Sequence, residues 1–197
     1  MGLDQCIRAV QDKVGATVDG NAGPDTWKAL TNFLSVDSGA LNSPPLDKRS
    51  ETNIATLLPD VQPYARALVE KARSVGIEIR VISGTRSFEE QDRLYAQGRT
   101  SPGKIVSNAK GGESNHNFGL AFDVGVFEDG AYQAESPSYK AVGALGLQLG
   151  LSWGGNWKTI HDEPHFELRP LWAKDMSESA MLAALRERKA DGISAFA

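Results

Sequence analysis

The sequence has almost no cysteine and no long apolar run. Its 197 residues include one cysteine, Cys6, so a disulfide within the chain and a metal site made of several thiolates are both excluded. No stretch approaches the roughly 20 apolar residues that span a bilayer, and the N-terminus lacks a basic start followed by an apolar core. We therefore expect a chain made in the cytoplasm without a signal peptide and without membrane insertion. Cys6 is expected to be a small buried side chain on a helix.

Positive charge is not in surplus either. The chain has 21 Lys and Arg against 25 Asp and Glu, a formal net charge of -4. Because neutralising phosphates takes a surplus of basic side chains, binding of nucleic acid by bulk electrostatics is excluded. Hydrophobic residues make up 41% and charged residues 23%, which is typical of a globular chain with a real core. Nothing in the composition demands more than a monomer.

Residues 1–35 are predicted to form a small helical unit. Apolar residues recur at helical spacing from residue 4 onward, VDGNAGP turns the chain, and DTWKALTNFL, with Trp27 in its core, resumes a helix. The stretch AVQDKVGATVDGNAGPDTWKAL resembles the tandem-helix peptidoglycan-binding domain of wall hydrolases at its Q-x-x-x-G, V-D-G-x-x-G-P-x-T and W-x-A-L positions. The alternative is a helical hairpin that packs on the main domain.

The remainder is predicted to be a linker, a main domain and a C-terminal helix. Residues 36–50 are rich in Ser, Pro and Asp, which is typical of a linker. The main domain takes residues 51–175, and residues 176–197 form a last amphipathic helix with no assigned role beyond packing. Periodicity predicts helices over 57–76, 87–98 and 135–150, and strands over 77–84, 119–127 and 165–169. This mixture predicts an α+β fold with a mostly antiparallel sheet and flanking helices.

Two of the three histidines stand in contexts that suit metal binding. His116 precedes a predicted strand, and Asp123 lies on that strand seven residues later, so a glycine-assisted bend at 117–119 can bring both side chains to ligand distance. In the segment HFEL, the first and third residues point to one face of a strand and the second and fourth to the other. His165 can therefore face a cleft while Phe166 enters the core. His165 is thus the third predicted ligand.

Two imidazoles and one carboxylate form a donor set that zinc accepts. Three protein ligands leave the fourth tetrahedral position open for water, whose pKa falls toward about 7 when it is bound. A base must then take the proton, and two acids stand close to His165 in the chain, Asp162 and Glu163, with Pro164 stiffening the approach. The sequence thus predicts one Zn²⁺ per chain in a catalytic site and leaves both acids open as the base.

The run S-x-H-x-x-G-x-A-x-D at 114–123, followed by D-x-P-H-F at 162–166, resembles the zinc D-Ala-D-Ala carboxypeptidase and L-alanyl-D-glutamate endopeptidase family, which includes phage endolysins and the vancomycin-resistance dipeptidases. The match extends through SGTRSFEEQDRLYAQGRT and WGGNWK. The resemblance implies that His116, Asp123 and His165 bind zinc and that Asp162 is the general base. The vancomycin-resistance dipeptidases have Glu at the place of Asp162, so aspartate points to the endolysin-like branch.

Further residues are expected to contact the substrate. The family has an arginine at the place of Arg86, which implies a guanidinium that stabilises an oxyanion or holds a substrate carboxylate. Ser114 is expected to hydrogen-bond the substrate or a ligand. Trp153 and Trp157 either stack on the substrate or form the wall of the site. Gln91 is expected to be an ordinary exposed helix residue outside the site.

These patterns predict a zinc metallopeptidase that hydrolyses the stem peptide of bacterial peptidoglycan as an L-alanyl-D-glutamate endopeptidase, tethered to the wall by its N-terminal unit. One alternative is a D-Ala-D-Ala carboxypeptidase, which uses the same chemistry on another bond. A second is a non-catalytic, zinc-stabilised wall-binding protein, against which Asp162 and Arg86 speak because a binding module needs no base. Without a signal peptide, the enzyme would reach the wall after release by a separate lysis system, or would recycle wall peptides in the cytoplasm.

Overall fold

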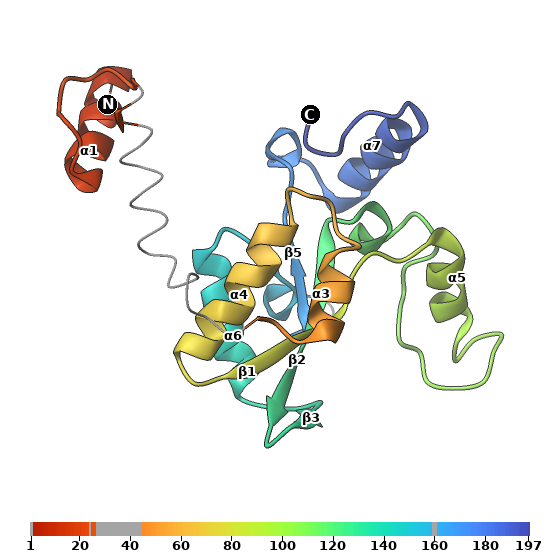
Figure 1. Cartoon of the computed structure of the whole chain (residues 1–197). Coiled ribbons are helices and arrows are strands. Elements are labelled where there is room, and N and C mark those ends of the chain that lie inside the picture. Colours follow the sequence, from red (N-terminus) through yellow and green to blue (C-terminus); the bar gives the residue numbers. More distant parts are fainter. Residues whose placement is uncertain (1, 24, 27–44, 159–160) are drawn as a thin grey trace. The chain divides into compact units, whose positions relative to one another are not determined.

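The computed structural model describes residues 2–23, 25–26, 45–158 and 161–197 (Figure 1). The chain divides into two compact units, Met1–Pro45 and Leu46–Ala197. The predicted second helix of the first unit, with Trp27, and most of the predicted linker 36–50 lie outside the described residues. Within the described ranges, no helix combines the length and the apolar character that crossing a bilayer takes.

The first unit contains α1 (Leu3–Val14) and the turn that follows it. Gln11 is fully buried, and its amide ties this turn to the helix. Gln11 Nε2 donates to Asp19 Oδ1 at 2.7 Å and to Thr26 Oγ1 at 2.9 Å, while Gln11 Oε1 accepts from the Gly20 amide at 2.9 Å. Cys6 is exposed, so the expectation of a buried thiol is wrong: the covered face of α1 is the one that carries Gln11.

Replacing Gln11 by alanine is expected to loosen this turn. The substitution removes the acceptor of the half-buried Gly20 amide, and a lost hydrogen bond of this kind costs about 1 kcal/mol. Exchange of the Gly20 amide hydrogen should accelerate roughly tenfold, as measured by hydrogen–deuterium exchange, with amides of the second unit unchanged. Gln5→Ala, which changes a glutamine on an exposed stretch of α1, is the control. Equal protection of Gly20 in the wild type and in Gln11→Ala would contradict the assignment.

The second unit is built on an antiparallel sheet with the strand order β1-β2-β5-β4. Its strands are β1 (Glu78–Ser83), β2 (Ala121–Glu128), β5 (His165–Glu167) and β4 (Ser152–Trp153), and β3 (Ala131–Gln133) pairs with β2. Every pairing is antiparallel, which confirms the predicted α+β fold. The sequence did not predict β3 or β4, because their residues, AYQ and SW, are few and show no clear alternation of apolar and polar side chains.

Helices flank this sheet (Figure 1). The predicted helical segments contain α4 (Gln62–Ser74), α5 (Phe88–Ala96), α6 (Ser138–Gln148) and α7 (Glu178–Ala190). A capping box begins α5: Ser87 Oγ accepts from the Glu90 amide at 3.1 Å, and Glu90 Oε2 accepts from the Ser87 amide at 2.7 Å. A further helix, α3 (Lys48–Ile54), begins inside the segment predicted as linker.

The packing of α6 on the sheet fixes the direction of the β5 side chains. Phe166 is fully buried, and its ring stacks on that of Phe122 with the centroids 5.9 Å apart. A Cβ atom on Gly146 of α6 would lie only 2.4 Å from the Phe166 ring, so glycine permits this close approach. Because Phe166 enters the core, its neighbours on β5, His165 and Glu167, point to the opposite face, as the alternation predicted.

Candidate metal centre

A short turn carries His116 to the face of the sheet. The 3₁₀ helix η2 (Asn115–Phe118) ends at Gly119, whose φ of 70° lies in the left-handed region that favours glycine. The His116 carbonyl accepts from the Arg86 amide at 3.0 Å, which joins the turn to the connection between β1 and α5. The glycine-assisted bend predicted at 117–119 is therefore present.

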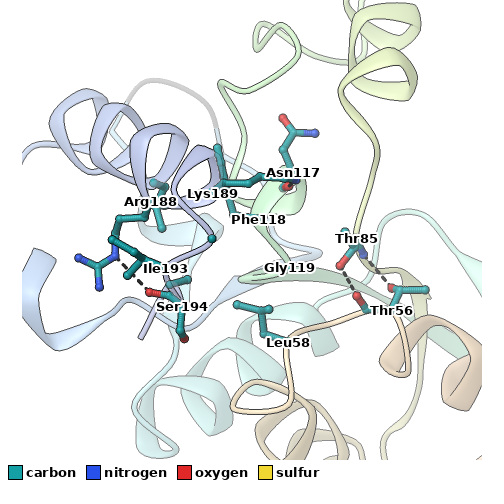
Figure 2. A pocket seen from close by; sticks show the side chains of 13 residues that line it. Thr56, Leu58, Thr85, Asn117, Phe118, Gly119, Arg188, Lys189, Ile193 and Ser194 are labelled. Carbon is teal, nitrogen blue, oxygen red and sulfur yellow. Dashed lines mark hydrogen bonds between the residues drawn. The ribbon is translucent and has the colours of Figure 1, made fainter. Parts of the chain in front are cut away.

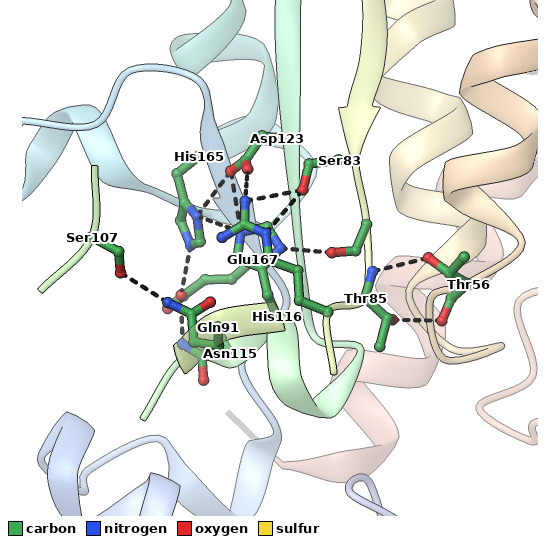
Figure 3. Close-up of polar contacts among 12 residues, drawn as sticks. Thr56, Ser83, Thr85, Gln91, Ser107, Asn115, His116, Asp123, His165 and Glu167 are labelled. Carbon is green, nitrogen blue, oxygen red and sulfur yellow. Dashed lines mark hydrogen bonds and ion pairs between the residues drawn. The ribbon is translucent and has the colours of Figure 1, made fainter. Parts of the chain in front are cut away.

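The side chains of His116, Asp123 and His165 converge (Figure 3). Asp123 and His165 are direct cross-strand partners on β2 and β5, so the sheet register alone brings two of them together. Both His116 Nε2 and His165 Nδ1 lie 3.2 Å from Asp123 Oδ1, and the two nitrogens are 3.3 Å apart. The two histidines are 2% and 5% exposed. The three predicted donors thus form one group whose ligand atoms lie within 4.8 Å of one another.

The hydrogen bonds on the far side of each imidazole determine which nitrogen carries the proton. His116 Nδ1 lies 2.8 Å from the Gly84 carbonyl oxygen, and His165 Nε2 lies 3.1 Å from Glu167 Oε2. Since both oxygens only accept, each of these nitrogens is the N–H, and neutral rings would direct two lone pairs at the Asp123 carboxylate. Three acceptors facing one another require a positive charge between them, so this chemistry fits a metal cation.

The pKa shifts of His165 and Asp123 also favour a positive charge. Burial by itself lowers the pKa of His165, but hydrogen bonds to Asp123 and Glu167 overcome this and raise it to about 10. Burial likewise opposes ionisation of Asp123, yet the two imidazoles hold the pKa of this carboxyl well below its usual range. Both shifts favour a positive charge at the centre.

Arg86 lies against the second oxygen of Asp123. Arg86 Nη2 donates to Asp123 Oδ2 at 2.5 Å and to Ser83 Oγ at 3.0 Å, and Arg86 Nε also donates to Ser83 Oγ at 3.2 Å. Asp123 thus presents one oxygen to the imidazoles and the other to the guanidinium. In the part of the chain that the structure describes, Nη1 of Arg86 makes no hydrogen bond, so it can meet a substrate.

Asp162 lies beside the three donors. Burial and the charge of Asp123 raise the pKa of Asp162, while the two histidines and Arg86 oppose this rise. The Asp162 carboxyl therefore interacts electrostatically with all four of these residues. Asp162 packs closely against Gly154, where a Cβ atom would lie 3.2 Å from Asp162 Cβ. The other acid predicted as a possible base, Glu163, accepts the Trp153 indole N–H through its backbone carbonyl at 2.7 Å.

The remaining predicted residues differ in how directly they meet the centre. Trp157 is 38% exposed, and its ring centroid lies 4.8 Å from that of His165, so it offers an accessible surface at the centre. Trp153 is half-buried, and a Cβ atom on Gly143 of α6 would lie 2.5 Å from its ring. The Trp153 ring therefore packs against α6. Ser114 is half-buried and immediately precedes η2.

Sequence reasoning missed two residues that support the centre and misjudged the burial of a third residue elsewhere. Asn115 Nδ2 donates to Glu167 Oε2 at 2.6 Å, so both residues support His165 from behind. The alternation in HFEL already placed Glu167 on the face of His165, but nothing in the local pattern singled out Asn115. Gln91, expected to be exposed, is 1% exposed, and its Nε2 donates to Ser107 Oγ at 2.8 Å. The expectation failed because the covering segment is an irregular loop without periodicity.

A cavity of about 320 Å³ lies beside the turn that carries His116 (Figure 2). Its walls come from the turn, from the end of α7 and the segment after it, from the segment after α3 and from the connection between β1 and α5. They include Asn117, Gly119, Lys189, Leu58 and Thr85. None of the three converging donors lines this cavity. This cavity is therefore separate from the three converging donors.

Two buried imidazoles and a carboxylate that converge beside a further carboxylate and an arginine are the arrangement of a metal-dependent hydrolase. Comparison with known proteins narrows this class. A family model described as D-alanyl-D-alanine carboxypeptidase, from the M15 peptidases, matches residues 107–168. The chain is 42% identical over 125 residues to the peptidoglycan L-alanyl-D-glutamate endopeptidase CwlK of Bacillus subtilis, an alignment that covers 58% of this chain and 74% of that protein.

A second relative is the L-alanyl-D-glutamate peptidase of Listeria phage A118, 27% identical over 124 residues, which cover 60% of this chain and 40% of the phage protein. Among solved structures, the L-Ala D-Glu endopeptidase ChiX of Serratia marcescens matches with a TM-score of 0.50 and 25% identity, over 66% of this chain and 93% of that one. The chain belongs to the M15 family of peptidases. It is accordingly a hydrolase, as the motifs predicted.

Proposed function

We propose that this protein is a zinc-dependent endopeptidase that cuts the L-alanyl-D-glutamate bond in the stem peptide of bacterial peptidoglycan. The observation that carries this proposal is the convergence of His116, Asp123 and His165 as three acceptors around one point. These residues bind one zinc ion per chain, since imidazole nitrogen and carboxylate oxygen are ligands that zinc accepts. The relatives named for the L-alanyl-D-glutamate bond support the choice of bond.

The residues around the centre divide the work of hydrolysis. Zinc, when bound, supplies Lewis acidity toward the scissile carbonyl and toward the attacking water. Asp162 accepts a proton from that water and returns it to the leaving amine. Arg86 holds the Asp123 carboxylate in position and presents Nη1 to the negative charge that develops on the substrate. Trp157 and Ser114 contact the substrate peptide on the side of the centre that is open to solvent. Trp153 forms part of the wall of the site.

The proposal also includes a role for the first unit and the place where the enzyme acts. The first unit tethers the enzyme to peptidoglycan, which raises the local concentration of the catalytic domain at its substrate. The chain acts as a monomer on the cell wall.

Digestion of purified peptidoglycan tests the bond specificity. We expect new fragments that begin with the free amino group of D-glutamate and others that end with the carboxyl group of L-alanine, identified by mass spectrometry. A zinc chelator should abolish their formation, and added zinc should restore it. Release of free D-alanine without these fragments would favour the D-alanyl-D-alanine carboxypeptidase that the matching family model describes. Retention on peptidoglycan with no new termini would instead favour a binding protein.

A further inference from the structure

We infer that α7 is a positioning element of the metal centre and that its first residue, Glu178, supports His165 through Asn115 and Glu167. The inference rests on the proposed role of His165 as a metal ligand. It gives the C-terminal helix a role beyond packing, because α7 makes polar contacts with the turn that carries a second ligand, His116. Glu178 touches neither substrate nor metal, so it is a positioning residue.

A continuous set of hydrogen bonds joins Glu178 to His165. Asn115 Nδ2 donates to Glu178 Oε1 at 2.7 Å. It also donates to Glu167 Oε2 at 2.6 Å, and Glu167 Oε2 lies 3.1 Å from His165 Nε2 (Figure 3). An amide nitrogen has two hydrogens, so Asn115 can serve both carboxylates at once. The arrangement holds Glu167 where it fixes the His165 tautomer, with the Nδ1 lone pair directed at the metal position.

Burial gives these contacts their value. Asn115 and Glu167 are 6% and 5% exposed, and a hydrogen bond between buried polar groups is expensive to leave unmade. Without the Glu178 carboxylate, Asn115 would lose the partner that orients one of its two N–H groups. The Asn115 side chain would then rotate more freely, and Glu167 and the His165 ring would follow.

The same helix also contacts the turn on the other side of His116. Lys189 Nζ donates to the Asn117 carbonyl at 3.1 Å (Figure 2), and Arg186 Nη1 donates to the Gly112 carbonyl at 2.8 Å. The turn is thus held from α7 at Asn115, through Glu178, and at Asn117, through Lys189, which are the residues directly before and after His116. The contact of Arg186 with Gly112 lies ahead of the turn. The helix itself is anchored in the core through its buried apolar face, formed by Met181, Leu182 and Leu185.

The inference is tested by measuring the zinc affinity of three variants of the full-length chain: Glu178→Ala, Glu178→Gln and Glu187→Ala. The measurement is competition with a chromophoric chelator at a temperature where circular dichroism shows every variant to be fully folded. Glu178→Ala is expected to bind zinc about tenfold more weakly, at the lower end of the 10- to 100-fold loss seen when outer partners of metal ligands are removed. Glu178→Gln keeps an oxygen that accepts from Asn115, so its affinity should stay within about twofold of the wild type.

The glutamine variant separates two explanations. Glu178 also forms an ion pair with Arg169 at 3.0 Å, and this pair is lost in both variants, so equal weakening by alanine and by glutamine would assign the effect to Arg169 and overturn the inference. Glu187→Ala, at an exposed position of the same helix, should bind like the wild type. A wild-type protein that binds no zinc would refute the proposed function itself, whereas wild-type affinity in Glu178→Ala would refute only the role of α7.

Discussion

Replacing His116 by alanine is expected to abolish zinc binding and to reduce peptidoglycan hydrolysis by about a thousandfold or more. The substitution removes one of three donors and leaves Asp123 and His165 facing a buried gap. Two donors hold zinc far more weakly than three, and loss of the metal removes several kcal/mol of transition-state stabilisation, at about 1.4 kcal/mol for each factor of ten in rate. The measurements are zinc content after dialysis, by plasma mass spectrometry, and the initial rate of release of new amino groups from peptidoglycan.

The thermal response to zinc shows whether the loss is specific. A ligand that binds only the folded state raises the melting temperature, so zinc should stabilise the wild type and leave His116→Ala unchanged. His161→Ala is a matched control, because His161 is an exposed histidine outside the donor group, and it should retain both zinc and activity. One equivalent of zinc in dialysed His116→Ala would remove His116 from the ligand set.

The donor group could be predicted because its geometry follows from local rules. The alternation along HFEL sets the direction of His165, and the antiparallel pairing of β2 with β5 places Asp123 directly opposite. His116 then needs only a turn that ends in a glycine, which the sequence contains. The longer helices and strands were predictable for the same reason, since each shows several periods of its hydrophobic pattern.

The supports of the donor group could not be predicted, because they depend on contacts between distant segments. Asn115 bonds to residues 52 and 63 positions away, Glu167 and Glu178, and neither separation leaves a mark in the local pattern. The local pattern predicts that Gln91 is exposed, but an irregular loop that contains Ser107 covers its side chain. Arg86 was expected to face a substrate, and its pairing with Asp123 depends on the register between β1 and β2.

Replacing Asp162 by asparagine is expected to separate metal binding from catalysis. Asparagine keeps the size of the side chain but cannot take a proton from the attacking water, and general-base catalysis contributes typically 10²- to 10⁴-fold. We therefore expect kcat/KM to fall by about that factor while zinc affinity stays within about threefold of the wild type. Wild-type activity should fall on the acidic side as Asp162 takes up a proton and can no longer act as the base. This limb should be absent in Asp162→Asn.

Glu163→Gln decides which of the two neighbouring acids is the base. The Glu163 contact in the structure is made by its backbone carbonyl to the Trp153 indole, and this contact survives the substitution. Glu163→Gln should therefore retain most of the activity and the acidic limb of the wild type. The reverse result, an active Asp162→Asn and an inactive Glu163→Gln with zinc bound in both, would move the proton transfer to Glu163. Loss of activity in both variants would mean that the two carboxylates share the work, because removing either member of a unit then costs nearly as much as removing both.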